Sequence, residues 1–410
     1  MTSALTDSAA SWLDEIPTRL AALDAAHLTR RRRRVRPANG ASLWVDGRKM
    51  LAFCSNDYLG LSQHPALRAA ACEAAREYGV GSGSSPMVSG HSEANSALEM
   101  ELATFVGLER ALYFYAGYAT NASIVPALVG AGDALFSDAL NHACLIDGAR
   151  LSKADIHRYG HADMAQLDGL LRASNARRKL VVSDAVFSMD GDVIDIPALI
   201  TLCERHDALL LLDDAHGFGV CGPQGRGSLA AVDRVGGHAS RRVLYMATLG
   251  KAAGVAGAFV AGKDTLIEWL LQKTRSYTFA TAAPALLAQS IRAALRVMQA
   301  EPERIARLHR HIAAFRAGLP AAIAGTNWTL LPSNTAVQAL IIGENEEALQ
   351  VMRTLAEAGL WVPAIRPPTV ANGTARLRIA LSAAHEAADI DLLLAALAKV
   401  ASTVGIESRK

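Results

Sequence analysis

Cysteine is scarce in this 410-residue chain, and the few thiols lie far apart. The five cysteines include no Cys-x-x-Cys pair, and an odd number of scattered cysteines disfavours a disulfide framework. No apolar run approaches the roughly 18 residues that a membrane-spanning helix needs. The N-terminal sequence also lacks the basic segment and apolar core of a secretory signal peptide. We therefore expect a cytoplasmic protein with reduced thiols.

Excess charge of either sign is missing as well. The formal net charge is +2 at pH 7, so no overall electrostatic field favours a nucleic acid as partner. The chain has no Gly-x-Ser-x-Gly segment typical of serine hydrolases, and His385-Glu386 lacks the second histidine of a zinc peptidase. With 51% hydrophobic and 20% charged residues, the sequence is that of a globular protein long enough for two domains.

One local run of charge does stand out, because arginine fills residues 30–34 and recurs at Arg36. Such a run is typical of a solvated face or of a nucleic-acid patch. A nucleic-acid-binding protein would need a basic face that extends beyond this run, and the near-neutral net charge disfavours one. The glycine-rich residues 79–90 are followed by no Gly-Lys-Ser/Thr, so they are not a nucleotide-binding loop.

Periodic apolar residues predict the main elements of the fold. Helical spacing is found in residues 12–28, 64–78, 92–106, 305–319 and 390–400. Short apolar runs predict strands at residues 50–54, 111–115, 133–137, 180–182, 208–212, 243–247, 257–262, 336–342 and 376–381. Several of these runs are apolar throughout, which is typical of parallel strands that are buried on both faces.

Polar side chains follow two of these buried strands. Residues 208–212 lead to Asp213, Asp214 and His216, and residues 243–247 lead to Thr248 and Lys251. In an open α/β sheet the ligand crevice lies at the carboxyl ends of the strands. Small residues surround Lys251 and no carboxylate is adjacent to it, which suits an amine that acts as a nucleophile.

The Asp-x-Ala-His segment at 213–216 and the Thr-x-Gly-Lys segment at 248–251 resemble the signature of the α-oxoamine synthases, which are pyridoxal-phosphate enzymes. The resemblance extends from about Arg30 to His385. It implies the aspartate-aminotransferase-type α/β fold (fold type I), with a mostly parallel central sheet, flanking helices and a smaller α+β C-terminal domain. We expect an N-terminal segment at residues 1–55, a large cofactor-binding domain at 56–285 and a small domain at 286–410.

The resemblance assigns the cofactor ring to five residues. Lys251 would form the imine link, and Asp213 would pair with the pyridine nitrogen and keep it protonated, a role for which Asp-x-Ala-His spacing selects it over Asp214. His142 would stack on the ring, and Ser188 would lie near the ring hydroxyl. His216 would bond the ring hydroxyl or the substrate carbonyl. Without the resemblance, His142 is more typical of a structural histidine, and Ser188 fits a turn equally well.

The cofactor phosphate is assigned to backbone and hydroxyl groups. Gly117 and Tyr118 open a helix whose unpaired N–H groups attract a phosphate. Thr248 would add its hydroxyl, and Thr281 would reach the phosphate of a neighbouring subunit. The implied active enzyme is therefore a homodimer.

The implied substrate residues are Arg30, Asn56, His142, Arg366, Thr369 and Arg378. Arg30 would meet the acyl group or its carboxylate, although the arginine run leaves its register open. The arginine fork suits a carboxylate, and we favour Arg378 as the anchor of the amino acid and Arg366 as a mobile arginine. The alternatives are an Asx-type turn at Asn56 and surface ion pairs at the two arginines.

The reaction that this resemblance implies is a decarboxylative condensation of an amino acid with an acyl thioester. The motifs at 55–61, 365–370 and 373–378 are most similar to those of members that join L-alanine to a pimeloyl thioester of coenzyme A or of acyl-carrier protein. The alternatives are glycine C-acetyltransferase, then serine palmitoyltransferase or 5-aminolevulinate synthase. A non-catalytic carrier of the cofactor would keep Lys251 but lose the substrate arginines, which are present.

Overall fold

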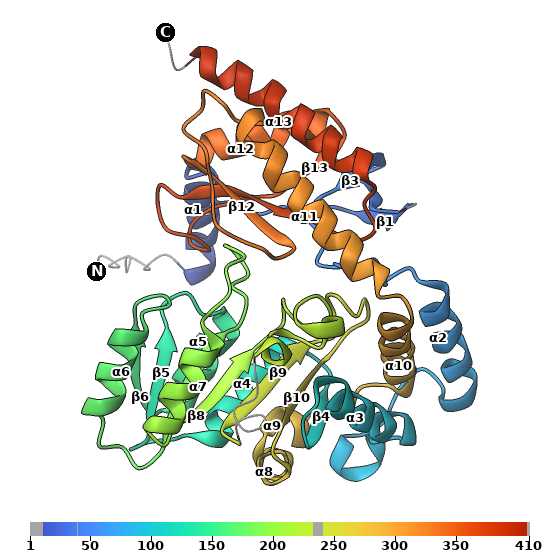
Figure 1. Ribbon diagram of the computed structural model, residues 1–410, viewed down its shortest axis with the longest axis vertical. Helices are drawn as coiled ribbons and strands as arrows, with labels where there is room; N and C mark the ends of the chain where they lie inside the picture. The colour runs from blue at the N-terminus through green and yellow to red at the C-terminus, as the bar shows by residue number, and fades with distance from the viewer. Residues whose placement is uncertain (1–10, 39, 233–240, 408–410) are drawn as a thin grey trace, which may run out of the picture.

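A seven-stranded sheet forms the centre of the computed structural model, which describes residues 11–38, 40–232 and 241–407 (Figure 1). Its order is β4-β10-β9-β8-β7-β5-β6, and all neighbouring strands are parallel except at β10, which is antiparallel to β4 and β9. The strands are β4 (Arg110–Phe114), β5 (Ala134–Asp138), β6 (Asp155–Tyr159), β7 (Lys179–Asp184), β8 (Leu209–Asp213), β9 (Val243–Thr248) and β10 (Ala258–Gly262).

Helices cover both faces of this sheet. The side chains that alternate along each strand are therefore buried on both sides. On β9, Leu244 packs with the apolar residues of α4 (Gly117–Leu128), α5 (Ala143–Ser152) and α8 (Asp264–Lys273). The neighbouring Val243 faces the opposite layer, which holds α6 (Met164–Ala173) and α7 (Ile196–Arg205). Tyr245 on that same face packs with α3 (Glu93–Val106) and α10 (Ala285–Ala300). The result is a three-layer α/β arrangement, as the sequence predicts.

The C-terminal part contains an antiparallel sheet with the order β11-β12-β15-β14. Its apolar side chains join the same core as the long helices α11 and α13, which lie together at the top of Figure 1. The elements are β11 (Thr329–Leu330), β12 (Val337–Gly343), β14 (Ala364–Ile365), β15 (Ala375–Ala380), α11 (Glu303–Ala322), α12 (Asn345–Glu357) and α13 (Ala387–Glu407).

The N-terminal strands join the C-terminal part of the chain and not the large sheet. β3 (Arg48–Ala52) pairs on one side with β2 (Ser42–Val45), which continues to β1 (Val35–Pro37). On its other side β3 pairs in parallel with β13 (Leu360–Trp361). Figure 1 shows these blue strands among the orange and red elements. The two ends of the sequence therefore fold together.

The shorter elements connect these layers. They are α2 (Pro65–Tyr78), α9 (Arg275–Thr278), a π-turn η1 (Pro86–Gly90) within the glycine-rich segment, and the 3-10 turns η2 (Pro223–Gly225) and η3 (Ser228–Ala231). Among the described helices, none is long and apolar enough to cross a membrane. The helices and strands named in the sequence analysis are all present, with shifts of a few residues at their ends.

The first helix differs most from its prediction. α1 (Trp12–Ala25) ends before residue 28, because His27 takes a positive φ of 56° that cannot continue a helix. No residue of α1 is buried, and Trp12 and Leu13 remain 70% and 65% exposed. Its apolar spacing is typical of a packed face, but of its large apolar side chains Trp12, Leu13, Leu20 and Leu23 stay exposed and Ile16 is half-buried.

Candidate active site

Four parallel strands and the lysine loop bring the polar candidates to one edge of the large sheet. His142 follows β5, Asp184 ends β7, Asp213 ends β8, and Thr248 ends β9 just before Lys251. The strands lie side by side in the order β9-β8-β7-β5, so their carboxyl ends share this edge. In a parallel sheet this carboxyl edge is where a ligand site is expected.

Lys251 is held by a histidine and not by a carboxylate. Its Nζ atom lies 2.7 Å from Nε2 of His216, which is itself buried. Burial lowers the pKa of Lys251 to about 8, although the carboxylates of Asp213 and Asp184 act in the opposite direction. An amine with this pKa is partly unprotonated near neutral pH, as a nucleophile or a general base requires.

Asp213 is a buried carboxylate whose hydrogen bonds come from neutral groups. Nδ2 of Asn121 donates to its Oδ2 at 2.5 Å, and the Ala215 amide donates to Oδ1 at 2.9 Å. No arginine or lysine forms an ion pair with it within the described chain. Asp214 differs, because Ser228 and Tyr245 bond both of its oxygens inside the core. Asp213 thus accepts two hydrogen bonds and Asp214 three.

His142 is fixed at the N-terminus of α5. Its Nδ1 accepts from the Cys144 amide at 3.3 Å as the helix cap, and its own amide donates to Asp184 at 2.6 Å. Burial lowers the pKa of His142, so the imidazole is neutral near pH 7. Burial and the nearby Asp213 raise the pKa of Asp184. A neutral ring held at both its backbone and its cap is suited to stacking on a flat ligand.

A second group of candidates gathers at the N-terminus of α4. The cap residue Ala116 makes no side-chain hydrogen bond, so the first-turn N–H groups of the helix have no side-chain acceptor. A Cβ atom added to Gly117 would lie 3.5 Å from Oγ1 of Thr248, which places that hydroxyl beside the helix end. Tyr118 points away and donates to Asp147. Backbone N–H groups and a hydroxyl thus form a cradle for an anion.

Asn56, Ser188 and Arg378 form the other side of the site. Arg378 is buried, and its NH1 and NH2 atoms donate to Oδ1 of Asn56 at 3.2 and 3.3 Å. Its Nε donates to the carbonyl of Ser188 at 2.5 Å. These three bonds use three of the five guanidinium N–H donors, so two remain for a carboxylate. Arg376 has a different partner, because it pairs with Asp190.

Arg30, Thr369 and Arg366 lie together. NH2 of Arg30 is 3.4 Å from Oγ1 of Thr369, and Arg366 donates to the carbonyl of His27. Burial and the charge of Arg30 lower the pKa of Arg366. The Nε atom of Arg366 is buried without a hydrogen-bond partner. Two neighbouring guanidinium groups with an unused donor favour an anionic group.

Comparison with known proteins shows the family of the chain. The sequence profile of the aminotransferase class I and II family matches residues 48–397. The 8-amino-7-oxononanoate synthase of Paracidovorax citrulli is 71% identical over 96% of each chain, and that of Delftia acidovorans is 69% identical over 95% of this chain and 97% of its own. The chain belongs to the 8-amino-7-oxononanoate synthase family, within the aminotransferase class I and II family.

Solved structures show the same architecture. A serine palmitoyltransferase from S. paucimobilis, with a bound PLP conjugate of myriocin, superposes with a TM-score of 0.88 at 26% identity over 96% of this chain and 98% of its own. An 8-amino-7-oxononanoate synthase from Francisella tularensis matches with a TM-score of 0.74 at 26% identity over 88% of this chain and 99% of its own. The fold is therefore the aminotransferase-type fold of pyridoxal-phosphate enzymes.

The described residues fit pyridoxal 5′-phosphate, the cofactor of this family. Asp213 supplies a buried carboxylate with no cationic partner, which a protonated pyridine nitrogen would satisfy. The α4 terminus and Thr248 supply the phosphate cradle. Lys251 supplies an amine with a lowered pKa. The donor set and charges thus match the three polar parts of the cofactor.

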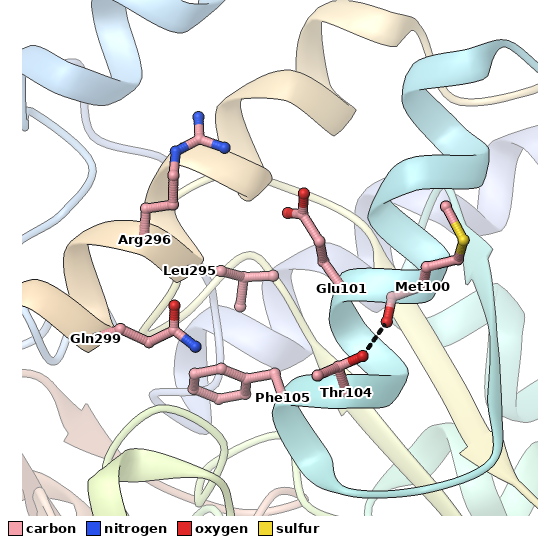
Figure 2. Close-up of a pocket in the computed structure, with 7 residues that line it drawn as sticks. All are labelled: Met100, Glu101, Thr104, Phe105, Leu295, Arg296 and Gln299. Carbon is pink, nitrogen blue, oxygen red and sulfur yellow. Dashed lines mark hydrogen bonds between the residues drawn. The ribbon is translucent and has the colours of Figure 1, made fainter.

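Thr281 is the predicted cofactor residue that would act on a neighbouring subunit. It is exposed, and so is its neighbour Phe279, at 71%. A separate hollow of about 340 Å³ between α3 and α10 is also outside the site (Figure 2). Figure 2 shows Glu101 and Arg296 on opposite helices of that hollow. None of the predicted site residues lines it.

Three residues of the site were missed by sequence reasoning, and one of them is Asp184, which ends β7 and accepts from the His142 amide. Tyr58 is fully buried, and its hydroxyl lies 2.6 Å from Nδ1 of His216. Asn121 is also fully buried and bonds Asp213. Asn121 comes four residues after Gly117, so helical spacing put it on the same face of α4 as the phosphate cradle. Tyr58 lies within the segment already singled out around Asn56, where its partner was not evident.

Proposed function

We propose that the chain condenses L-alanine with a pimeloyl thioester, releasing carbon dioxide and free thiol to give 8-amino-7-oxononanoate for biotin synthesis. The observation that carries this proposal is the lysine, histidine and buried carboxylate at the sheet edge, in a chain 71% identical to a protein of that name. The reaction takes place in the cytoplasm and in a homodimer. The substrates are small molecules, with the thioester carried by coenzyme A or by acyl-carrier protein.

Lys251 moves the proton in this proposal. When bound, pyridoxal phosphate supplies an electron sink that weakens the bonds to the alanine Cα atom. The Nζ atom of Lys251 takes the proton from Cα and later returns one, as its pKa of about 8 allows. Asp213 would hold its negative charge against the pyridine nitrogen, and His142 would hold one face of the ring and shield it from water. Removing Lys251 is expected to abolish turnover.

Arg378 and Asn56 orient the amino acid. The two free N–H donors of Arg378, one on each terminal nitrogen, are open to the alanine carboxylate. Asn56 holds the guanidinium group in place through its Oδ1 atom. A fixed carboxylate sets the angle between the Cα–H bond and the cofactor plane, which decides which bond breaks. Replacing Arg378 should therefore raise KM for L-alanine and lower kcat together.

Arg30, Arg366 and Thr369 receive the acyl donor. A pimeloyl chain carries a second carboxylate at its far end, and the two guanidinium groups with the unused Nε donor are suited to it. An acetyl group offers no such carboxylate. This cluster therefore favours the pimeloyl donor over the acetyl donor of glycine C-acetyltransferase, and the sequence relatives favour the same choice.

The homodimer is supported by exposed apolar residues near Thr281. Phe279 is 71% exposed and Val88 is 80% exposed. Their two segments are joined, because the Ala282 amide donates to the carbonyl of Ser84 at 2.9 Å. Clustered apolar exposure of this kind marks an interaction surface. A second subunit on this surface would cover it and bring Thr281 to the neighbour's phosphate.

Release of free thiol tests the activity. Protein loaded with pyridoxal phosphate is mixed with pimeloyl-CoA or acetyl-CoA, each with L-alanine or glycine. Turnover strongest with pimeloyl-CoA and L-alanine is expected. Turnover strongest with acetyl-CoA and glycine would overturn the substrate assignment. If no coenzyme A thioester reacts, pimeloyl-acyl-carrier protein is tested, and failure with that donor also would refute the proposal.

Mixed dimers test the shared site. Lys251→Ala and Thr281→Glu homodimers should both be inactive, because each loses one part of both sites. A dimer with one subunit of each kind keeps one complete site. Random mixing should therefore restore about a quarter of wild-type thiol release. No recovery after mixing, with exchange of subunits verified, would contradict the contribution of Thr281 across the interface.

A further inference from the structure

A continuous chain of hydrogen bonds leads from Lys251 to Arg378. Nζ of Lys251 lies 2.7 Å from Nε2 of His216, and Nδ1 of the same ring lies 2.6 Å from the Tyr58 hydroxyl. That hydroxyl donates to Oδ1 of Asn56 at 3.1 Å. The same Oδ1 atom accepts from both terminal nitrogens of Arg378. The chain connects the reactive amine to the arginine on the other side of the site.

The direction of each bond in this chain follows from the arginine end. A guanidinium group can only donate, so the Asn56 atom that faces it is the carbonyl oxygen and not the amide nitrogen. A carbonyl oxygen can only accept a hydrogen bond, so Tyr58 donates its one hydroxyl proton to Asn56. The Tyr58 oxygen then has only lone pairs to offer His216. The bond between them must therefore be donated by Nδ1–H of the imidazole.

The imidazole carries one proton and not two. Burial lowers the pKa of His216 well below its ordinary value, and the positive charges of Lys251 and Arg378 and the nearby His142 act in the same direction. No carboxylate within the described chain forms an ion pair with this ring. With its single proton on Nδ1, the ring has an unprotonated Nε2.

We propose that Tyr58 is a positioning residue that holds His216 in the Nδ1-protonated tautomer, so that Nε2 presents a lone pair to Lys251. Arg378 and Asn56 fix the direction of the Tyr58 hydroxyl and therefore belong to the same hydrogen-bond chain. The bearing of this tautomer on catalysis rests on the proposed function. The tautomer itself rests on the hydrogen bonds of the chain.

The tautomer decides what His216 can bind. An Nε2 lone pair accepts a hydrogen bond from an N–H or O–H group. It therefore accepts a hydrogen bond from Lys251 and would accept one from the ring hydroxyl of the cofactor. It cannot donate to a substrate carbonyl oxygen. Of the two roles that the sequence left open for His216, the structure therefore favours the hydroxyl contact. It also directs a lysine N–H toward His216, which orients the amine lone pair elsewhere.

Nitrogen NMR of the full-length protein tests the tautomer directly. The protein is labelled with ¹⁵N-histidine, and the His216 resonances are assigned by their loss in His216→Gln. Wild type should show a protonated Nδ1 and an unprotonated Nε2, with and without added pyridoxal phosphate. In Tyr58→Phe the acceptor of Nδ1–H is lost, so the proton should move to Nε2 and the two resonances should exchange their ranges.

Tyr245→Phe is the matched control. Tyr245 is equally buried, and its hydroxyl bonds Asp214 at 2.8 Å, whereas the Tyr58 hydroxyl bonds both Asn56 and His216. In Tyr245→Phe, the tautomer of His216 should stay as in wild type. In Tyr58→Phe, kcat for thiol release should fall by about tenfold with little change in KM for the thioester.

Two results would overturn the proposal. A wild-type His216 with Nε2 protonated would do so without any variant, even if Tyr58→Phe failed to fold. A Tyr58→Phe protein that keeps Nδ1 protonated would also do so. These outcomes are separate from the proposed function, because the NMR measurement does not depend on turnover. Absence of thiol release by wild type would instead count against the function alone.

Discussion

Replacing Lys251 with methionine is expected to stabilise the cofactor-free chain while it abolishes thiol release. Burial lowers the pKa of Lys251 from 10.5 to about 8. A lysine that binds its proton more weakly in the folded state costs stability at any pH where the unfolded chain keeps that proton. Methionine has a similar length and no charge, so it removes this cost.

The magnitude follows from the shift and from what is lost with it. A pKa change from 10.5 to about 8 corresponds to about 3 kcal/mol at 1.36 kcal/mol per unit. Lys251 is only partly buried, so solvent screening reduces this figure. Loss of the hydrogen bond to His216 reduces the gain in stability by about 1 kcal/mol more. The net gain in the free energy of unfolding is therefore about 1–2 kcal/mol at pH 7.

The pH dependence distinguishes this cause from a general packing effect. Below pH 8 both folded and unfolded wild-type chains carry the proton, and the cost is complete. Between pH 8 and 10.5 the folded wild type has released it, so wild type gains stability relative to Lys251→Met as the pH rises. Thermal unfolding of the two cofactor-free proteins from pH 7 to pH 10.5 measures this gap.

The control is Lys49→Met, which removes an exposed lysine of β3 and the same charge. Its melting temperature should stay within experimental error of wild type over the whole pH range. The reasoning would be refuted if Lys251→Met melted below wild type at pH 7. It would also be refuted if the gap between them did not shrink above pH 8.

Three further changes have defined outcomes. Asp213→Asn should lower thiol release by at least about a hundredfold and weaken cofactor binding, because a neutral amide cannot hold a protonated pyridine nitrogen; absorbance titration with pyridoxal phosphate checks this. Asn121→Ala should weaken cofactor binding by about tenfold in the same titration, since Asp213 loses its 2.5 Å donor. His161→Gln should destabilise the protein most below pH 6.5. Hydrogen bonds to Asp138 and Asp192 raise the pKa of His161 to about 10, so this contribution declines from pH 6.5 and is lost by about pH 10 in thermal melts.

Local sequence patterns were sufficient for the elements and for the candidates at strand ends. Runs that are apolar throughout predicted β8 and β9, and polar residues directly after them had to lie at the carboxyl edge of a parallel sheet. Asp213 and Lys251 could therefore be placed near each other without coordinates. The resemblance to a known family then supplied the roles of both.

Contacts between distant segments could not be predicted in this way. Nothing near Tyr58 in the sequence indicates His216, and the 2.6 Å bond between them depends on how two separate loops meet. The partners of Arg376 and Arg378 are of the same kind, although the sequence analysis already favoured Arg378 as the carboxylate anchor. Only the structure shows that Arg376 is occupied by Asp190, whereas Arg378 contacts Asn56.

The pairing of β3 with β13 has a consequence for synthesis of the protein. Leu51 pairs with Leu360, and Asn56 accepts a hydrogen bond from Arg378. Neither contact can form until most of the chain has left the ribosome. Until then β3 exposes an open strand edge, which is prone to pair with other chains. The large sheet can assemble earlier, because its strands lie between residues 110 and 262. A chain truncated before residue 360 would therefore hold the strands around Lys251 without the partner of β3 and without Arg378.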